Sequence, residues 1–196
     1  MTTGKCIERG DCCGENTDTC FARDSGGALG SPEVPGRCCF KNGKDGTNRR
    51  DDNDCGGSKT TFGRWGWTNG PYNFATDLPV NLTFYCGAAQ CKIDGKTNLG
   101  IVTIVTDEEK KITATWITSM PNFWKMHLGC GSGEGTALPA DSGVYPVITT
   151  GQGDKYTVAP GQYEFSSSSD TIEVLERPDL AKCDELWIII HTCNAD

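Results

Sequence analysis

The chain has 196 residues, a formal net charge of −8, and 26 acidic against 18 basic side chains. This length is sufficient for one hydrophobic core, or for one core with a small disulfide-stapled module. The acidic balance argues against binding to nucleic acid, because a phosphate backbone needs a basic protein face. No apolar run approaches the roughly 20 residues of a membrane span, so we expect none.

The cysteine content is high for a soluble chain and predicts a disulfide framework formed in an oxidising compartment. Met1 to Lys5 contain no apolar stretch of the signal-peptide kind, but the cysteines still predict secretion. Zinc binding by the cysteines is the weaker interpretation, because the sequence lacks paired Cys-x-x-Cys knuckles. The twelve cysteines, all expected in disulfides, are Cys6, Cys12, Cys13, Cys20, Cys38, Cys39, Cys55, Cys86, Cys91, Cys130, Cys183 and Cys193.

The distribution of the cysteines predicts a covalent link between the two parts of the chain. Seven lie in the first 55 residues and five lie later, and both counts are odd. If all twelve pair within the chain, at least one bridge joins the first 55 residues to the rest. Sequence alone leaves the pairing open.

Residues 1–56 hold many glycines and charges and almost no apolar periodicity. Such a segment cannot bury enough surface to fold by its own core, so we predict a loop-rich module held by disulfides. Its acidic loop contains Asp51, Asp52 and Asp54, whose oxygens suit calcium. The spacing differs from that of an EF-hand, and a solvated turn is the favoured interpretation.

Residues 57–80 are rich in aromatic side chains and glycine. Trp65, Trp67 and Tyr72 could form a platform for sugar rings, or they could pack into the core. Packing is favoured, because large aromatic side chains mostly serve burial. Asn69-Gly70-Pro71 is a turn signal.

The rest of the chain reads as short strands separated by turns, which predicts an all-β, jelly-roll-like sandwich over residues 57–196. In the first strand, Val80, Leu82, Phe84 and Cys86 share one face, while Asn81, Thr83 and Tyr85 share the other. Asn81-Leu82-Thr83 is also an N-glycosylation sequon. Further strands are expected at Leu99–Thr106, Lys111–Thr118, Phe123–Gly129, Gln162–Ser166 and Thr171–Glu176, with a short helical turn near Asp179–Lys182.

The most apolar run, Trp187 to His191, predicts a strand buried on both faces at the centre of the sandwich. His127 and His191 both fall in predicted strands. We therefore expect both histidines to have hydrogen-bonded core roles, which is favoured over a shared metal site.

Several blocks resemble a family of secreted β-sandwich domains of extracellular and cell-surface proteins. The resemblance covers about residues 62 to 193 and implies the fold and an extracellular setting, with no catalytic activity. Cys86 and Cys130 depart from the pattern and suggest an added bridge. The blocks are RWGWTNG from Arg64, YCGAAQC from Tyr85, HLG from His127, APGQY from Ala159 and WIIIH from Trp187.

No enzyme is predicted, because no nucleophile elbow and no convincing pair of carboxylates occurs in the sequence. The favoured hypothesis is an extracellular structural glycoprotein that assembles head to tail with copies of itself into a filament or matrix. The alternative is a carbohydrate-binding or adhesion module that uses Trp65, Trp67 and Tyr72. Calcium is the one cofactor considered.

Overall fold

The computed structural model describes ten segments of the chain: residues 17–24, 38–40, 66–88, 93–96, 98–118, 123–131, 145–151, 153–174, 180 and 183–195. The described residues are all-β, as the sequence predicts, apart from the 3₁₀ helix η3 (Pro160–Gln162) and Leu180, which is also in a 3₁₀ conformation. None of their helices is long and apolar enough to cross a membrane.

Twelve strands make up the described fold. Most of them are short, as expected for a sandwich. They are β1 (Thr17–Asp24), β2 (Cys38–Phe40), β3 (Gly66–Tyr72), β4 (Val80–Cys86), β5 (Asn98–Thr106), β6 (Ile112–Trp116), β7 (Trp124–Gly131), β8 (Val147–Thr150), β9 (Gly153–Tyr156), β10 (Phe165–Ser167), β11 (Thr171–Val174) and β12 (Glu185–Ala195).

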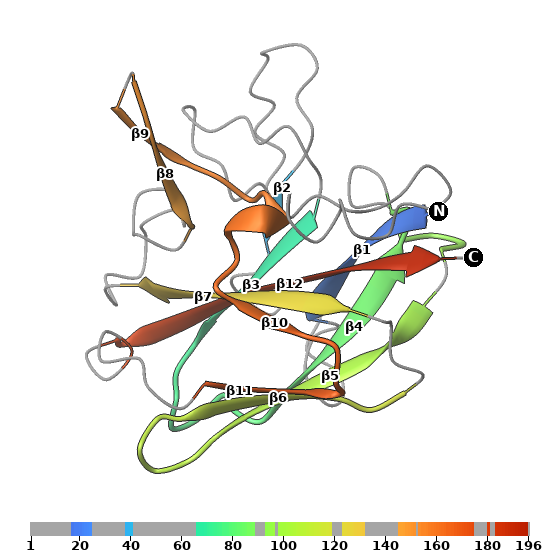
Figure 1. Cartoon of the computed structure of the whole chain (residues 1–196). Coiled ribbons are helices and arrows are strands. Elements are labelled where there is room, and N and C mark those ends of the chain that lie inside the picture. The colour runs from blue at the N-terminus through green and yellow to red at the C-terminus, as the bar shows by residue number, and fades with distance from the viewer. Residues whose placement is uncertain are drawn as a thin grey trace.

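Ten of the strands form one antiparallel sheet that curls until it is nearly closed (Figure 1). Its order is β10-β7-β12-β1-β4-β5-β6-β11, and β3 joins it beside β12, with β2 beyond β3. The two end strands, β10 and β11, come into contact. Strands β8 and β9 form a separate two-stranded sheet, which stands away from the large sheet at the upper left of Figure 1.

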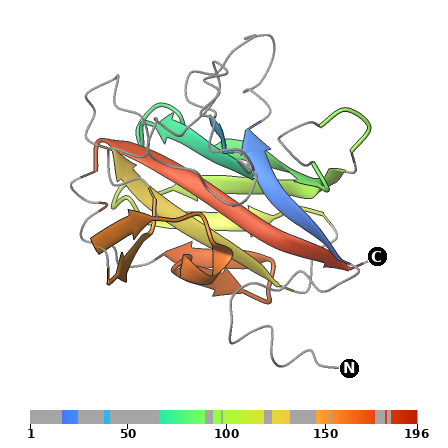
Figure 2. The ribbon, with the colours of Figure 1, turned by 90° about the horizontal axis from the view of Figure 1, so that it is seen from above.

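Strand β12 is the centre of the fold and the longest strand described. It pairs with β7 from Glu185 to Thr192 along one edge. Along its other edge, it pairs first with β3 and then with β1. Figure 2 shows β12, in red, running beside β7 and converging with β1, in blue, toward its carboxyl end. The predicted central strand is therefore confirmed.

The two faces of β12 lie in different apolar clusters. Leu186, Ile188 and Ile190 belong to the main core, which fills the space enclosed by the curled sheet and includes Phe84, Trp116 and Trp124. Ile189 belongs to a second cluster on the outer side of the sheet. This outer cluster contains Phe21, Trp67, Ala88, Tyr145, Val158, Tyr163 and Ile189. Burial on both faces explains why the strand is a continuous apolar run.

Most strands predicted from alternation are present with small shifts at their ends. Of the expected strand Gln162–Ser166, Gln162 belongs to η3 and the strand begins only at Phe165. In β4, Val80, Leu82, Phe84 and Cys86 are buried on one face as expected, and Asn81 is exposed. Thr83, placed by the alternation on the open face, is nevertheless 8% exposed and counts as buried. Of the short helical turn expected near residues 179–182, only Leu180 is among the described residues, and it is in a 3₁₀ conformation as expected.

Strand β1 falls within residues 1–56, which the sequence predicts to be a separate module. It lies instead between β12 and β4 in the middle of the large sheet, and Cys20, Phe21 and Ala22 are completely buried. For these eight residues the boundary at residue 56 is wrong, because their core is that of the sandwich. Strand β2 also joins the large sheet. The remaining residues of the predicted module lie outside the described part of the chain.

Candidate functional site

A buried amide closes the junction at which β1 and β3 meet along the same edge of β12. Asn69 is completely buried. Its Nδ2 donates hydrogen bonds to the carbonyl oxygens of Ala22, at 3.1 Å, and Ile188, at 3.2 Å. Its Oδ1 accepts a hydrogen bond from the backbone nitrogen of Asp24 at 2.8 Å. One side chain therefore joins three strands at a place where the regular backbone pairing changes partner.

Two neighbours of Asn69 were expected, under the alternative hypothesis, to stack on sugars. Trp67 and Tyr72 are each 3% exposed, so neither ring presents a face to solvent. Tyr72 donates a hydrogen bond through its hydroxyl to Oδ2 of buried Asp24 at 2.9 Å, and Trp67 packs edge-on against Tyr85. The favoured interpretation, packing, is confirmed for these two rings, and the sugar platform built on them is wrong. Trp65 lies outside the described residues.

Asn69-Gly70-Pro71, expected to be a turn, lies inside strand β3. Gly70 has a φ of +124°, a conformation that favours glycine, and its peptide bond to Pro71 is cis. A Cβ atom at Gly70 would lie 2.6 Å from the carbonyl oxygen of Leu186. Glycine is therefore required here for the close approach of β3 to β12, and the turn prediction is wrong because turn-forming residues serve this crossing instead.

The two histidines are both buried, and both have partners within the fold. Nδ1 of His127 lies 2.7 Å from Oε2 of Glu164, just before β10, and its ring lies beside that of Tyr163. The His191 ring packs edge-on against Phe21 on the neighbouring strand, at 4.9 Å between centroids. The hydrogen-bonded core role is confirmed for His127. Among the described residues, no group of three or more histidine, cysteine or acidic side chains could hold a metal ion.

The outer cluster contains a second buried hydrogen bond. Thr68 donates through its hydroxyl to the Tyr145 hydroxyl oxygen at 2.9 Å. Burial raises the pKa of the Tyr145 hydroxyl well above its usual range, and the bond from Thr68 lowers it in part. Tyr145 therefore stays neutral, and the pair links β3 to the chain that leads into β8.

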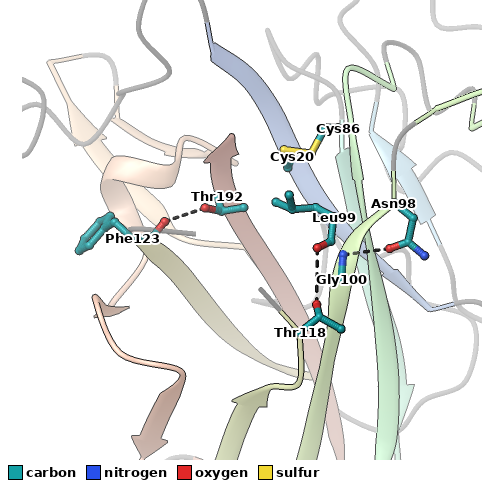
Figure 3. Close-up of a disulfide and its surroundings, with 8 residues drawn as sticks. All are labelled: Cys20, Cys86, Asn98, Leu99, Gly100, Thr118, Phe123 and Thr192. Atoms are coloured by element: carbon teal, nitrogen blue, oxygen red, sulfur yellow. Dashed lines mark hydrogen bonds between the residues drawn. A yellow bond between two sulfur atoms is a disulfide. The ribbon is translucent and has the colours of Figure 1, made fainter. Parts of the chain in front are cut away.

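Five of the predicted disulfide cysteines are bonded in the described structure, four of them on the large sheet and one, Cys183, just before β12. Cys20 of β1 is bonded to Cys86 of β4 (Figure 3), which confirms a bridge from the first 55 residues to the rest. Cys130 of β7 is bonded to Cys183, which precedes β12. Cys193 is disulfide-bonded as well. Of the other cysteines, Cys38 and Cys39 lie in β2, and the remaining five lie outside the described residues.

Side chains also form hydrogen bonds with backbone groups close to the ends of several strands. Figure 3 shows Thr192 of β12 donating to the carbonyl oxygen of Phe123, at 2.6 Å, and Thr118 lying close to that of Leu99. In the same view, Asn98 accepts from the backbone nitrogen of Gly100 at 2.9 Å. These bonds hold strand ends in place and leave the polar groups committed to the fold.

The exposed candidate site is Asn81, the second residue of β4. Its Oδ1 accepts a hydrogen bond from the Thr103 hydroxyl of β5 at 2.7 Å. The expected calcium ligands Asp51, Asp52 and Asp54 lie outside the described residues, so calcium binding stays a prediction.

Sequence reasoning missed the roles of Asn69, Asp24 and Glu164. The sequence around the buried Asn69 is also typical of a turn, so its position in a strand could not be recognised. Glu164 is separated from His127 by 37 residues, and no local pattern connects the two. The one available signal was the density of aromatic residues around Asn69, which is typical of a buried segment.

Comparison with known proteins gives no match to a family model, to a curated protein or to a solved structure. The resemblance to secreted β-sandwich domains therefore stays a prediction.

Proposed function

We propose that this chain is an extracellular structural protein, a disulfide-stabilised subunit that assembles with copies of itself. The observation that carries the proposal is the identity of the hydrogen-bond partners of the buried polar side chains, which are other groups of the fold. Asn69 joins three strands, Tyr72 bonds Asp24, and His127 bonds Glu164. An enzyme site needs polar groups that converge on a ligand, whereas these groups converge on one another and on the backbone.

The disulfides support the extracellular setting. Two bridges described here link segments 66 and 53 residues apart in the sequence, so each constrains a long stretch of the unfolded chain. Bridges of this kind persist in oxidising compartments. A subunit that is stable before assembly suits a filament or matrix exposed to the environment.

The hairpin β8–β9 is the surface that we propose for assembly. It pairs with no other described strand, and a two-stranded sheet alone is marginally stable in water. Val147, at its start, is 50% exposed. A third strand from another copy would extend this sheet and cover Val147. The donor that we propose is the amino-terminal segment of the next copy, whose sequence cannot form a core alone.

This contact joins two different surfaces, so it is head to tail and produces a filament unless the rotation closes a ring. The net charge of −8 on each subunit opposes association. Salt screens this repulsion, so association should strengthen as the ionic strength rises.

Light scattering over a range of protein and salt concentrations tests the proposal. The expected result is a mass that rises with concentration and with salt. Deletion of residues 1–5, and separately Val147→Asp, should reduce that rise. Ile117→Asp is the matched control, because Ile117 is 60% exposed on a different surface. A monomer at all concentrations, unchanged by either alteration, would rule out self-assembly.

A further inference from the structure

The sequon at Asn81 lies within a strand that is paired along both edges. Asn81 is exposed, whereas Leu82 is completely buried and Thr83 is 8% exposed. Strand β4 pairs with β1 on one side and with β5 on the other. The hydrogen bond from Thr103 engages Oδ1 of Asn81, so the amide nitrogen, which is the atom that carries an N-linked sugar, is outside that bond.

On strands β1, β4, β5, β6 and β11, the described side chains that share the face of Asn81 are mostly uncharged, although the protein is strongly acidic. The two charged ones are Arg23, opposite Thr83, and Glu173. Asn81 lies opposite Thr103, Thr103 opposite Thr115, and Thr115 opposite Thr171, so that four strands contribute one polar row. We call this surface the threonine face. With the residues beside the row, it consists of Asn81, Ile101, Thr103, Val105, Thr113, Thr115, Ile117, Thr171 and Glu173.

Two of the four exposed large apolar side chains in the described residues are on the threonine face. Val105 is 39% exposed and Ile117 is 60% exposed. Glu173 is the one charged side chain among these nine residues, and Arg23 of β1, opposite Thr83, borders them. The surface thus combines hydroxyl groups with apolar side chains, which complements the hydroxyl rims and apolar ring faces of a sugar. Val105 and Ile101 are the diagonal neighbours of Asn81 on β5, within reach of a group attached to it.

We propose that Asn81 carries an N-linked glycan whose first sugars lie on the threonine face. The inference rests on the extracellular setting of the proposed function. The glycan would cover the apolar side chains of this face and exclude a second copy from it. Self-association is thereby restricted to other surfaces, including the hairpin β8–β9.

The attachment takes place before β4 is paired. A lipid-linked oligosaccharide diphosphate is the donor: the Asn81 amide nitrogen forms a bond to the first sugar carbon and loses a proton, while the bond from that carbon to the phosphate oxygen breaks and the lipid diphosphate leaves. The sequon hydroxyl of Thr83 is buried once the sheet has formed. The folded, unmodified chain should therefore be a poor acceptor.

Secretion of the full chain from eukaryotic cells, followed by intact mass measurement before and after peptide-N-glycosidase treatment, tests the attachment. The native chain and Thr83→Ser should both lose the mass of a glycan. Asn81→Gln should carry none. Thr83→Val, which keeps the branched shape and removes the hydroxyl, should also carry none. A secreted native chain with the mass of the bare polypeptide would overturn the proposal.

Hydroxyl-radical footprinting of the glycosylated chain against Thr83→Val tests where the sugars lie. Oxidation of Val105 and Ile117 should be lower in the glycosylated chain, while oxidation of Val147 should be equal in the two. Equal oxidation of Val105 and Ile117 would overturn the placement on the threonine face. Sedimentation of both forms separates this result from self-assembly. If the bare form alone associates and Ile117→Asp abolishes that association, the threonine face is an assembly contact and the glycan normally blocks it.

Discussion

Asn69 and Asp24 are joined by a 2.8 Å hydrogen bond from the Asp24 backbone nitrogen to the Asn69 Oδ1 atom, which ties β3 to β1 inside the protein. The same asparagine holds β12 through the Ile188 carbonyl oxygen. The place where two strands share one edge of a third is thus fixed by a side chain rather than by the backbone. At the next residue, Gly70, the backbone of β3 also passes close to that of β12.

Replacing Asn69 with alanine should destabilise the fold strongly. The change removes three buried hydrogen bonds and leaves polar backbone groups short of a partner, each at a cost of about 1–3 kcal/mol. We expect a total loss of about 3 kcal/mol or more in the free energy of unfolding, measured by urea denaturation. Asn73→Ala is the control, because Asn73 is exposed and accepts one bond from Ala75. Equal losses for the two variants would contradict the assigned role.

Alanine substitutions at three glycines distinguish the destabilisation caused by backbone strain from that caused by a steric clash. Gly70→Ala meets both, since φ is +124° and the new Cβ lies 2.6 Å from a backbone oxygen, so we expect a loss of about 3 kcal/mol or more. Gly95 has a φ of +67° and open space around it, which predicts a loss of about 1 kcal/mol. Gly151→Ala meets neither, and its effect should stay within about 0.5 kcal/mol. Thermal denaturation of the three variants gives the order, and a Gly70→Ala variant as stable as Gly151→Ala would contradict it.

The sequence predicted those strands whose side chains alternate clearly. In β4 and β6, buried residues recur at every second position, because each strand has one face on the core. Strand β1 was missed because Thr17 to Asp24 is polar at both ends and lies among cysteines and glycines. Strand β3 was missed because Asn69, Gly70 and Pro71 are the residues that also form turns.

The residues of the candidate sites also divide into those whose roles the sequence predicts and those whose roles it does not. The exposure of Asn81 followed from alternation, and the bridge between the two parts of the chain followed from counting cysteines. The partners of Asn69 and His127 could not be predicted, because they lie 37 to 119 residues away and are brought close by the curling of the sheet. Local pattern determines which face a residue occupies, whereas the closure of the sheet determines what it meets there.

Removing the Cys20–Cys86 bridge through a double change to alanine should reduce the free energy of unfolding by about 4 kcal/mol, because the unfolded chain regains the entropy of a long loop. The Cys130–Cys183 bridge closes a loop of similar length, so its removal should cost nearly the same, within about 0.2 kcal/mol on this ground. Chemical denaturation of the two double variants gives the comparison. A loss below about 1 kcal/mol for either pair would show that the bridge does not constrain the unfolded chain as argued.

Stability should fall at high pH because of Tyr145. Its pKa is raised by burial in the folded protein, whereas in the unfolded chain it is about 10. Below pH of about 10, both states keep the proton and this group adds no pH dependence. Above that value the unfolded chain releases its proton first, so stability declines by up to about 1.4 kcal/mol per pH unit until the folded protein also ionises. Tyr145→Phe should remove this part of the decline, as followed by urea denaturation between pH 8 and 12.

Thr68→Val is the matched control, because it removes the bond that lowers the pKa of Tyr145 and leaves the ring buried, so the decline should persist. The same slope in Tyr145→Phe as in the native chain would show that the alkaline loss comes from other groups.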